Sequence, residues 1–371
     1  MRLQLNLERL RIGLLALVGM ATGPASAAVL SEDRADAMYH YYDGGGTEVN
    51  GPALLVRKGI GEQVSAYASY YADSVSGASI DVVTTASPYK EKREELGVGV
   101  DFLRRDTKLS FSYSTSDERD YLSNTVGLDI AHEVFDGLST INFGYQVGRD
   151  EVGKVGTSFK EDVSRYHYKL GWSQVFTRSF LMSLEYEGIL ETGYLSSPYR
   201  AARLQGLLVP EIYPGTRDSY AVALQAIKGL GSEEGKLGAS LHLGYRYFWD
   251  TWDVTAHTID VSYQRRLGER WTLEPRYRYY QQSAASFYSD NFAANMNYMA
   301  RDKELSTFDS HSVGIKAAYR VLEQRHGLRT ATLNAAYDHV RFAYDDFTDM
   351  RNGETYEFDA RVVQLFFSAW Y

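Results

Sequence analysis

The stretch from Leu237 to Trp249, LGASLHLGYRYFW, decides the fold. Its large apolar and aromatic side chains occupy every second position, and most positions between them hold glycine, serine, histidine or arginine. Successive side chains of a β-strand point to opposite faces, so this alternation predicts a strand with one apolar and one polar face. The run is longer than the usual strand of about 5 or 6 residues, and a tilted transmembrane strand needs about 9 to 11.

The same alternation recurs along the rest of the chain and predicts about sixteen strands. We expect them near 34–42, 51–60, 63–72, 90–104, 106–117, 120–135, 138–151, 161–176, 179–194, 216–230, 235–250, 252–267, 270–283, 306–322, 327–345 and 354–371. Many of the 51 aromatic residues (30 Tyr, 16 Phe, 5 Trp) stand near the ends of these runs. Aromatic girdles at the two interfaces of a membrane explain that placement.

The expected connections alternate in length. Those near residues 61, 105, 136, 177, 268 and 325 are short, and those at 73–89, 152–160, 195–215, 284–305 and 346–353 are long. Outer-membrane barrels combine short periplasmic turns with long extracellular loops. The sequence therefore predicts an all-β, antiparallel up-and-down transmembrane barrel in the outer membrane of a Gram-negative bacterium, with both termini in the periplasm. Pro275 is the awkward residue, because proline is rare in central strands.

The two ends of the chain carry export and assembly features. An apolar segment from Ile12 to Met20 follows three arginines and precedes Ala25-Ser26-Ala27. This pattern predicts a signal peptide over residues 1–27 and a mature barrel over 28–371. The chain finishes on an amphipathic run ending Trp370-Tyr371, which is similar to the signal that the barrel-assembly machinery recognises.

Composition excludes several classes of function. The chain has no cysteine, so it forms no disulfide, thiolate zinc site or lipoprotein anchor. Its net charge of −9 argues against nucleic acid as a partner. Outer-membrane lipid and lipopolysaccharide are expected partners. No Gly-x-Ser-x-Gly or His-Glu-x-x-His motif occurs, and we expect no catalytic residue, cofactor or metal.

The polar faces of the expected strands supply candidates for the lining of a lumen. A barrel of this width is too wide for side chains alone to fill. The charges of the lining either form solvated pairs or build a constriction that selects solutes by charge. The candidate lumen charges are Glu185, Glu187, Arg246, Asp260, Arg276, Arg278, Lys316 and Arg320.

Two segments in expected loops are candidates for a plug or constriction. Residues 73–81 read DSVSGASID, where small residues favour tight turns. Residues 197–200 read SPYR, in a loop with three of the seven prolines, which limit its conformations. The alternative is that both are ordinary stiff surface loops. The residues concerned are Asp73, Ser76, Gly77, Ser79, Asp81, Ser197, Pro198, Tyr199 and Arg200.

These two segments, together with Tyr89, Glu91, Lys92 and Arg93, resemble the bacterial family catalogued as domain of unknown function 3570. The resemblance extends over the mature chain from about Asp33 to Tyr371. It implies an outer-membrane barrel of unestablished role. Genes for a thioredoxin-like protein, a small lipoprotein and a flavin transferase accompany the family, which implies a periplasmic lipoprotein or redox partner. It supplies no catalytic residues.

Two functions follow as expectations. The first is a porin-like channel for small solutes or ions. The alternative is a plugged structural or partner-binding barrel in an envelope system, which the resemblance associates with redox work.

Overall fold

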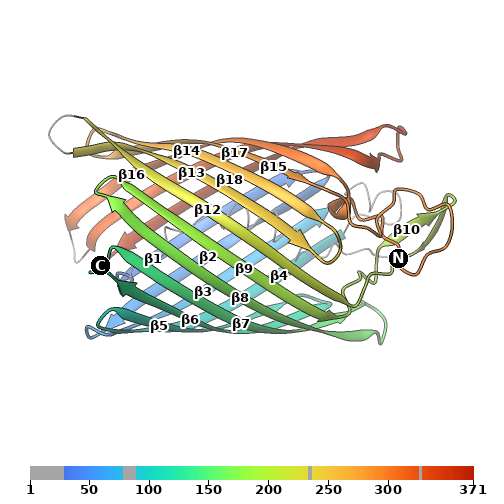
Figure 1. Cartoon of the computed structure of the whole chain (residues 1–371), viewed down its shortest axis with the longest axis horizontal. Helices are drawn as coiled ribbons and strands as arrows, with labels where there is room; N and C mark the ends of the chain where they lie inside the picture. Colours follow the sequence, from blue (N-terminus) through green and yellow to red (C-terminus); the bar gives the residue numbers. More distant parts are fainter. Residues whose placement is uncertain (1–28, 78–88, 233–235, 326–327) are drawn as a thin grey trace.

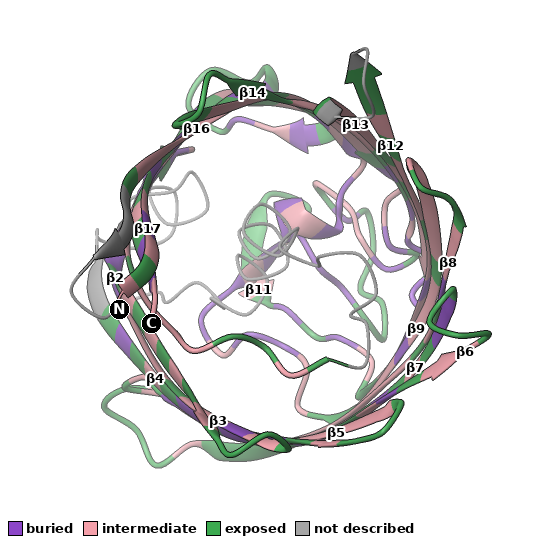
Figure 2. Ribbon diagram, turned by 90° about the vertical axis from the view of Figure 1, so that its left-hand side faces the viewer, coloured by how far each residue is buried: buried purple, intermediate pink, exposed green. Residues whose placement is uncertain are grey.

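The structure is a computed structural model that describes residues 29–77, 89–232, 236–325 and 328–371. Within these ranges sixteen strands pair antiparallel into one closed barrel (Figure 1, Figure 2). This confirms the predicted all-β fold and its strand number. The barrel strands are β1 (Arg34–Gly44), β2 (Thr47–Ile60), β3 (Val64–Gly77), β4 (Tyr89–Arg104), β5 (Thr107–Asp117), β6 (Tyr121–Val134), β7 (Ser139–Gly153), β8 (Lys160–Thr177), β9 (Phe180–Gly193), β12 (Thr216–Ser232), β13 (Lys236–Asp250), β14 (Thr255–Leu267), β15 (Trp271–Gln282), β16 (Phe308–Arg325), β17 (Leu328–Thr348) and β18 (Thr355–Trp370).

The first and last strands close the barrel. β1 pairs with β18 from Arg34 opposite Trp370 to Gly44 opposite Ala360. Every other barrel strand pairs with its neighbours in the chain, except that β9 pairs directly with β12. Closure leaves no sheet edge, so the backbone donors and acceptors of all strands find partners within the wall. In the described part of the chain, no helix has the length and apolar character needed to cross a membrane.

The strand register separates the two faces of the wall. On β13, Leu243 and Tyr245 are exposed on the outside, whereas Ser240 and Arg246 belong to the inward face. Large exposed apolar side chains recur on the outside of other strands, including Leu54 and Leu365. Such a surface is stable only in contact with lipid or another apolar phase.

The two ends of the barrel differ. The short turns and the carboxyl terminus lie at one end, which we call the turn end (Figure 1). The long connections lie at the opposite end, the loop end, where a separate hairpin of β10 (Ala201–Leu204) and β11 (Leu207–Pro210) stands beyond the wall (Figure 1). Viewed along the barrel, β11 and neighbouring loop segments lie within the outline of the ring (Figure 2).

Several expected boundaries were wrong. Residues 73–77 do not start a loop but continue β3, where they pair with 47–50 of β2 and 89–93 of β4. Ladder hydrogen bonds on both sides outweigh the turn preference of Asp, Ser and Gly. Ser79 and Asp81 lie outside the described residues. The first hairpin turns tightly at Gly45 and Gly46, whose positive φ values of 59° and 78° suit glycine, so both flanking strands are longer than expected.

Pro275 is accommodated inside β15. It pairs with Ile315 of β16, while the ladder between β14 and β15 is interrupted between the pairs Ser262–Arg276 and Arg265–Leu273. The missing donor of proline therefore falls at an irregularity in the ladder.

Candidate functional site

All eight candidate lumen charges belong to the inward face, because they alternate along their strands with side chains exposed on the outside. The structure brings together two pairs of them, Glu187 with Arg246 and Asp260 with Arg278, and the first pair lies on the wall formed by β8, β9, β12 and β13. Glu187 Oε2 accepts a hydrogen bond of 3.0 Å from Arg246 Nη2, and Glu187 Oε1 lies 2.7 Å from His167 Nε2. Lys169 Nζ is 3.8 Å from the same carboxylate. Three cationic or titratable side chains thus surround one acid.

The other candidates are more spread out. Arg276 forms a two-point ion pair with Asp338, one contact of which measures 2.7 Å between Nε and Oδ1. Arg278 Nε lies 3.8 Å from Asp260 Oδ1. Lys316 Nζ stands 5.5 Å from the ring centre of Phe366. Glu185 and Arg320 face the lumen on β9 and β16 without joining these pairs.

Asp73 lies in a buried polar cluster on the inner wall. Its Oδ1 is 2.6 Å from His40 Nε2, and both side chains are almost fully buried. The ring of Tyr71 stacks on His40 with centroids 5.0 Å apart, and Arg93 lies 3.8 Å from the second oxygen of Asp73. Asp73 is therefore part of the wall rather than of a plug. Ser76 and Gly77 are the last two residues of β3.

The loop end carries a packed layer that we call the loop cap, made of residues 194–215, 251–254 and 283–307. The connections are joined by short bridges, such as Ile212 to Met299 and Leu204 to Phe292. Trp252 and Leu305 are almost fully buried in one apolar cluster with Tyr213. A loop layer with its own buried core has a fixed structure rather than many interchanging ones.

Tyr199 ties this cap to the far wall. It belongs to a buried cluster with inward side chains of five strands: Tyr42 of β1, Val49 of β2, Val75 of β3, Val340 of β17, and Ala360 and Val362 of β18. Its hydroxyl oxygen accepts a 2.7 Å hydrogen bond from the backbone N–H of Val155. The connection that starts at β9 therefore reaches the inner wall opposite. The two predicted segments meet in this cluster, through Val75 and Tyr199.

Arg200 sits at the centre of the polar part of the cap. It forms an ion pair with Asp302, and both side chains are almost fully buried. The hydroxyl of Tyr213 lies 2.7 Å from Glu211 Oε2 and 3.3 Å from Asp302 Oδ2. The backbone N–H of Arg301 donates to Glu211 Oε1 over 2.7 Å. One cation and two acids are thus held in a buried hydrogen-bonded network that joins two loops.

Burial raises the pKa of Glu211 to about 7, against an ordinary 4.5. Arg200 opposes this rise, as do the hydrogen bonds from Tyr213 and Arg301, whereas Asp302 adds to it. The protonation of this carboxyl group therefore changes near neutral pH.

Sequence reasoning identified Arg200 and Tyr199 but missed their partners. Glu211 and Tyr213 lie between Pro210 and Pro214, and that proline-rich setting was the only signal present. Nothing in the sequence marks Asp302, which lies about ninety residues further on in a different loop. Among the described residues, no group of three or more histidine or acidic side chains is arranged to hold a metal ion.

Several solved structures are similar to this chain. A bacterial polysaccharide outer membrane secretin matches with a TM-score of 0.51 at 8% identity, covering 92% of this chain and 99% of that one. A Pseudomonas aeruginosa FadL homologue matches at 0.46 and 11%, covering 93% and 92%. The siderophore receptor PirA from Pseudomonas aeruginosa matches at 0.45 and 11%, covering 86% of this chain, which spans only 60% of the receptor. At such identities the likeness concerns the fold alone.

No curated protein sequence matches the chain. The model of one family, described as "Protein of unknown function (DUF3570)", matches residues 154–343, which is just over half of the chain and includes all three segments of the loop cap. With its sixteen-stranded closed wall, the chain is a β-barrel of the outer-membrane type and belongs to this DUF3570 family.

Proposed function

We propose that the mature protein is an outer-membrane channel for small solutes or ions, with both termini in the periplasm and its outer mouth narrowed by the loop cap. The observation that carries this proposal is the polar, charged inward face of β3, β4, β7 to β9 and β12 to β16. An interior filled by packed side chains would need apolar residues there, whereas charged side chains need water.

The loop cap would act as the constriction. It reaches across the mouth through Tyr199, and its rigid packing fixes which groups border the passage. The Glu187 cluster with Arg246 lies on the wall below it and supplies charge that discriminates between ions.

Single-channel recording of the purified, refolded mature protein in a planar bilayer tests this function. We expect steady openings and, in a salt gradient, a reversal potential. Arg246→Gln should move that potential toward cation preference, because a lumen cation is lost. Arg341→Gln is the matched control, since Arg341 is an exposed residue paired with Glu357. Repeated insertion without current, or equal shifts in both variants, would contradict the proposal.

The second candidate is a plugged barrel that binds a periplasmic lipoprotein or redox partner. It is favoured by one observation, the nearly complete burial of Trp252 and Leu305 in the cap, which is typical of a permanent closure. A silent bilayer together with co-purification of such a partner from gently solubilised membranes would support it. A barrel that conducts and purifies alone would exclude it.

A further inference from the structure

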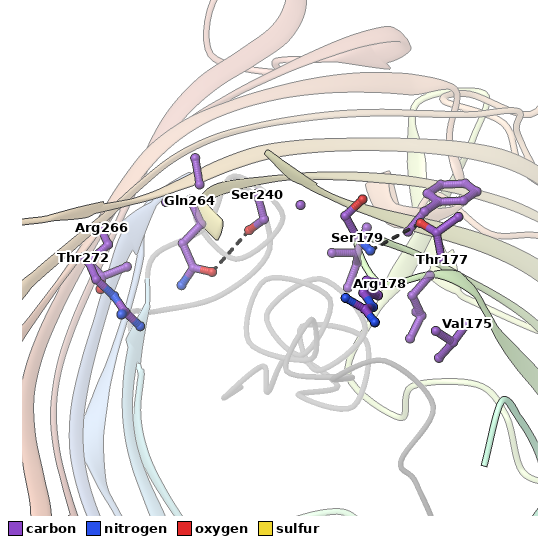
Figure 3. Close-up of a pocket in the computed structure, with 14 residues that line it drawn as sticks. Val175, Thr177, Arg178, Ser179, Ser240, Gln264, Arg266 and Thr272 are labelled. Carbon is purple, nitrogen blue, oxygen red and sulfur yellow. Dashed lines mark hydrogen bonds between the residues drawn. The ribbon is translucent and has the colours of Figure 1, made fainter. Parts of the chain in front are cut away.

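A cavity of about 460 Å³ opens on the inner wall at the turn end (Figure 3). Fourteen residues line it, from the turn between β8 and β9 and from the adjoining parts of β12, β13, β14 and β15. This size is within the range of pockets that hold small molecules. It lies at the opposite end of the barrel from the loop cap and shares no residue with it.

The lining is rich in donors and contains no acid. Arg178 and Arg266 both border the cavity, with Thr177, Ser179, Ser240, Gln264 and Thr272 around them. Figure 3 shows Arg266 and Arg178 at opposite ends of the lining, with Gln264 and Ser240 between them. Among the described residues neither guanidinium forms an ion pair, in contrast to Arg246 and Arg276 higher on the wall. Two guanidinium groups without an ion pair to any described residue favour an anion with several acceptor oxygens.

One glycine in the lining leaves open space for a ligand in the cavity. Gly238 lies in the lining, and a Cβ atom added there would meet no other heavy atom within 4 Å. Val175, Leu181 and Ile227 supply an apolar patch beside the donors. A pocket with an apolar patch and a few converging donors suits a compact organic anion better than a bare hydrated ion.

The cavity also continues a basic strip on one side of the lumen. Among the described residues, the inward faces of β13 to β16 carry six basic side chains and three acids, Asp250, Asp260 and Glu274. The basic residues are Arg246, Arg266, Arg276, Arg278, Lys316 and Arg320. Arg246, Arg276 and Arg278 are paired with Glu187, Asp338 and Asp260, so only part of this basic charge is left to attract an anion, and salt weakens that attraction.

We infer that this cavity is a binding site for a small organic anion with two negative charges, a dicarboxylate or a phosphate ester, at the periplasmic exit of the lumen. The inference rests on the proposed function, because it names the class of solute that the channel would pass. Arg178 and Arg266 hold the charged oxygens, and the hydroxyl and amide side chains around them orient the remainder of the solute.

Equilibrium dialysis of the mature protein in detergent micelles at low salt tests the site with three probes: succinate, inorganic phosphate and the neutral succinamide. We expect succinate to bind, succinamide not to bind, and binding to weaken as salt is added. Phosphate binding as tightly as succinate would show that charge alone is recognised and would overturn the assignment to an organic anion. Equal binding of succinate and succinamide would overturn the site as a whole.

Variants locate the binding. Arg178→Gln and Arg266→Gln should each lower the affinity for succinate at least about tenfold, which is the effect of removing one charged hydrogen-bond donor. Arg265→Gln is the matched control, because Arg265 is the next residue in β14 and lies on the opposite face of the strand. Gly238→Phe should fill the cavity and abolish binding while the protein still migrates as a closed barrel in unheated gels. An Arg265 variant as weak as the Arg266 variant, or unchanged binding in Gly238→Phe, would place the anion elsewhere.

The result is separable from the channel test. Succinate bound by a protein that never conducts would end the channel proposal and leave the site standing. Steady conductance without succinate binding would support the channel proposal and overturn the binding site.

Discussion

At the scale of single residues, the loop cap depends on a cation surrounded by acids. Arg200 neutralises Asp302 and lies near Glu211, and all three are buried. Arg200→Gln should loosen the cap by about 3 kcal/mol or more, because it leaves a buried acid without its partner. Combining it with Asp302→Asn should recover part of the loss. Limited proteolysis of the folded barrel measures this, and a double variant that is as protease-sensitive as the sum of the single ones would refute the coupling.

The raised pKa of Glu211 predicts that the stability of the loop cap depends on pH. Its pKa in the folded protein, about 7, is above the ordinary value of 4.5, so the folded cap binds a proton that the unfolded chain releases. The stabilisation is complete below about pH 4.5 and is lost as pH rises through 7. Loop cleavage, normalised to that of denatured protein at each pH, should be faster at pH 8 than at pH 5.5. Glu211→Gln should remove the difference, and a variant that keeps it would assign the effect to another group.

At the scale of elements, the connection between β9 and β12 matters most. It is anchored on the far wall by one aromatic side chain, Tyr199, within the cluster of Tyr42, Val49 and Val75. Tyr199→Ala should cost about 3 kcal/mol or more of local packing and free the segment from the wall. If the channel proposal holds, single-channel conductance rises in this variant. Val155→Ala, on the donor side of the hydroxyl contact, is the milder control and should leave conductance near that of the wild type.

The elements also show what the sequence can and cannot predict. Strands such as β13 and β16 could be located from the sequence because their apolar side chains, which face lipid, alternate with polar side chains, which face water. The hairpin of β10 and β11 was missed because strands of four residues have too little alternation to detect, and their position depends on contacts such as that between Leu204 and Phe292. The inward charges were recognisable for the same reason as the strands, but their partners depend on register between distant segments.

At the scale of the whole molecule, the closed wall makes a definite register prediction. Tyr39 of β1 faces Leu365 of β18, and both side chains are exposed on the outside. The natural chain has no cysteine. The double variant Tyr39→Cys with Leu365→Cys should therefore form a disulfide in the folded protein under mild oxidation. Cysteines at 39 and at Tyr337, on β17, are the control, since β18 separates them. A disulfide in the control pair, or the absence of one between positions 39 and 365, would contradict the pairing of β1 with β18.

The seam between β1 and β18 also sets the order of events during biogenesis. On the side away from β2, Arg34 finds its partner at Trp370, more than three hundred residues later, so the barrel cannot close before β18 has been synthesised. Pairing over such a sequence distance is slow, and the unpaired apolar strands are prone to aggregate while they wait. A deletion that removes β1 or β18 would therefore be as damaging to closure as the loss of a central strand.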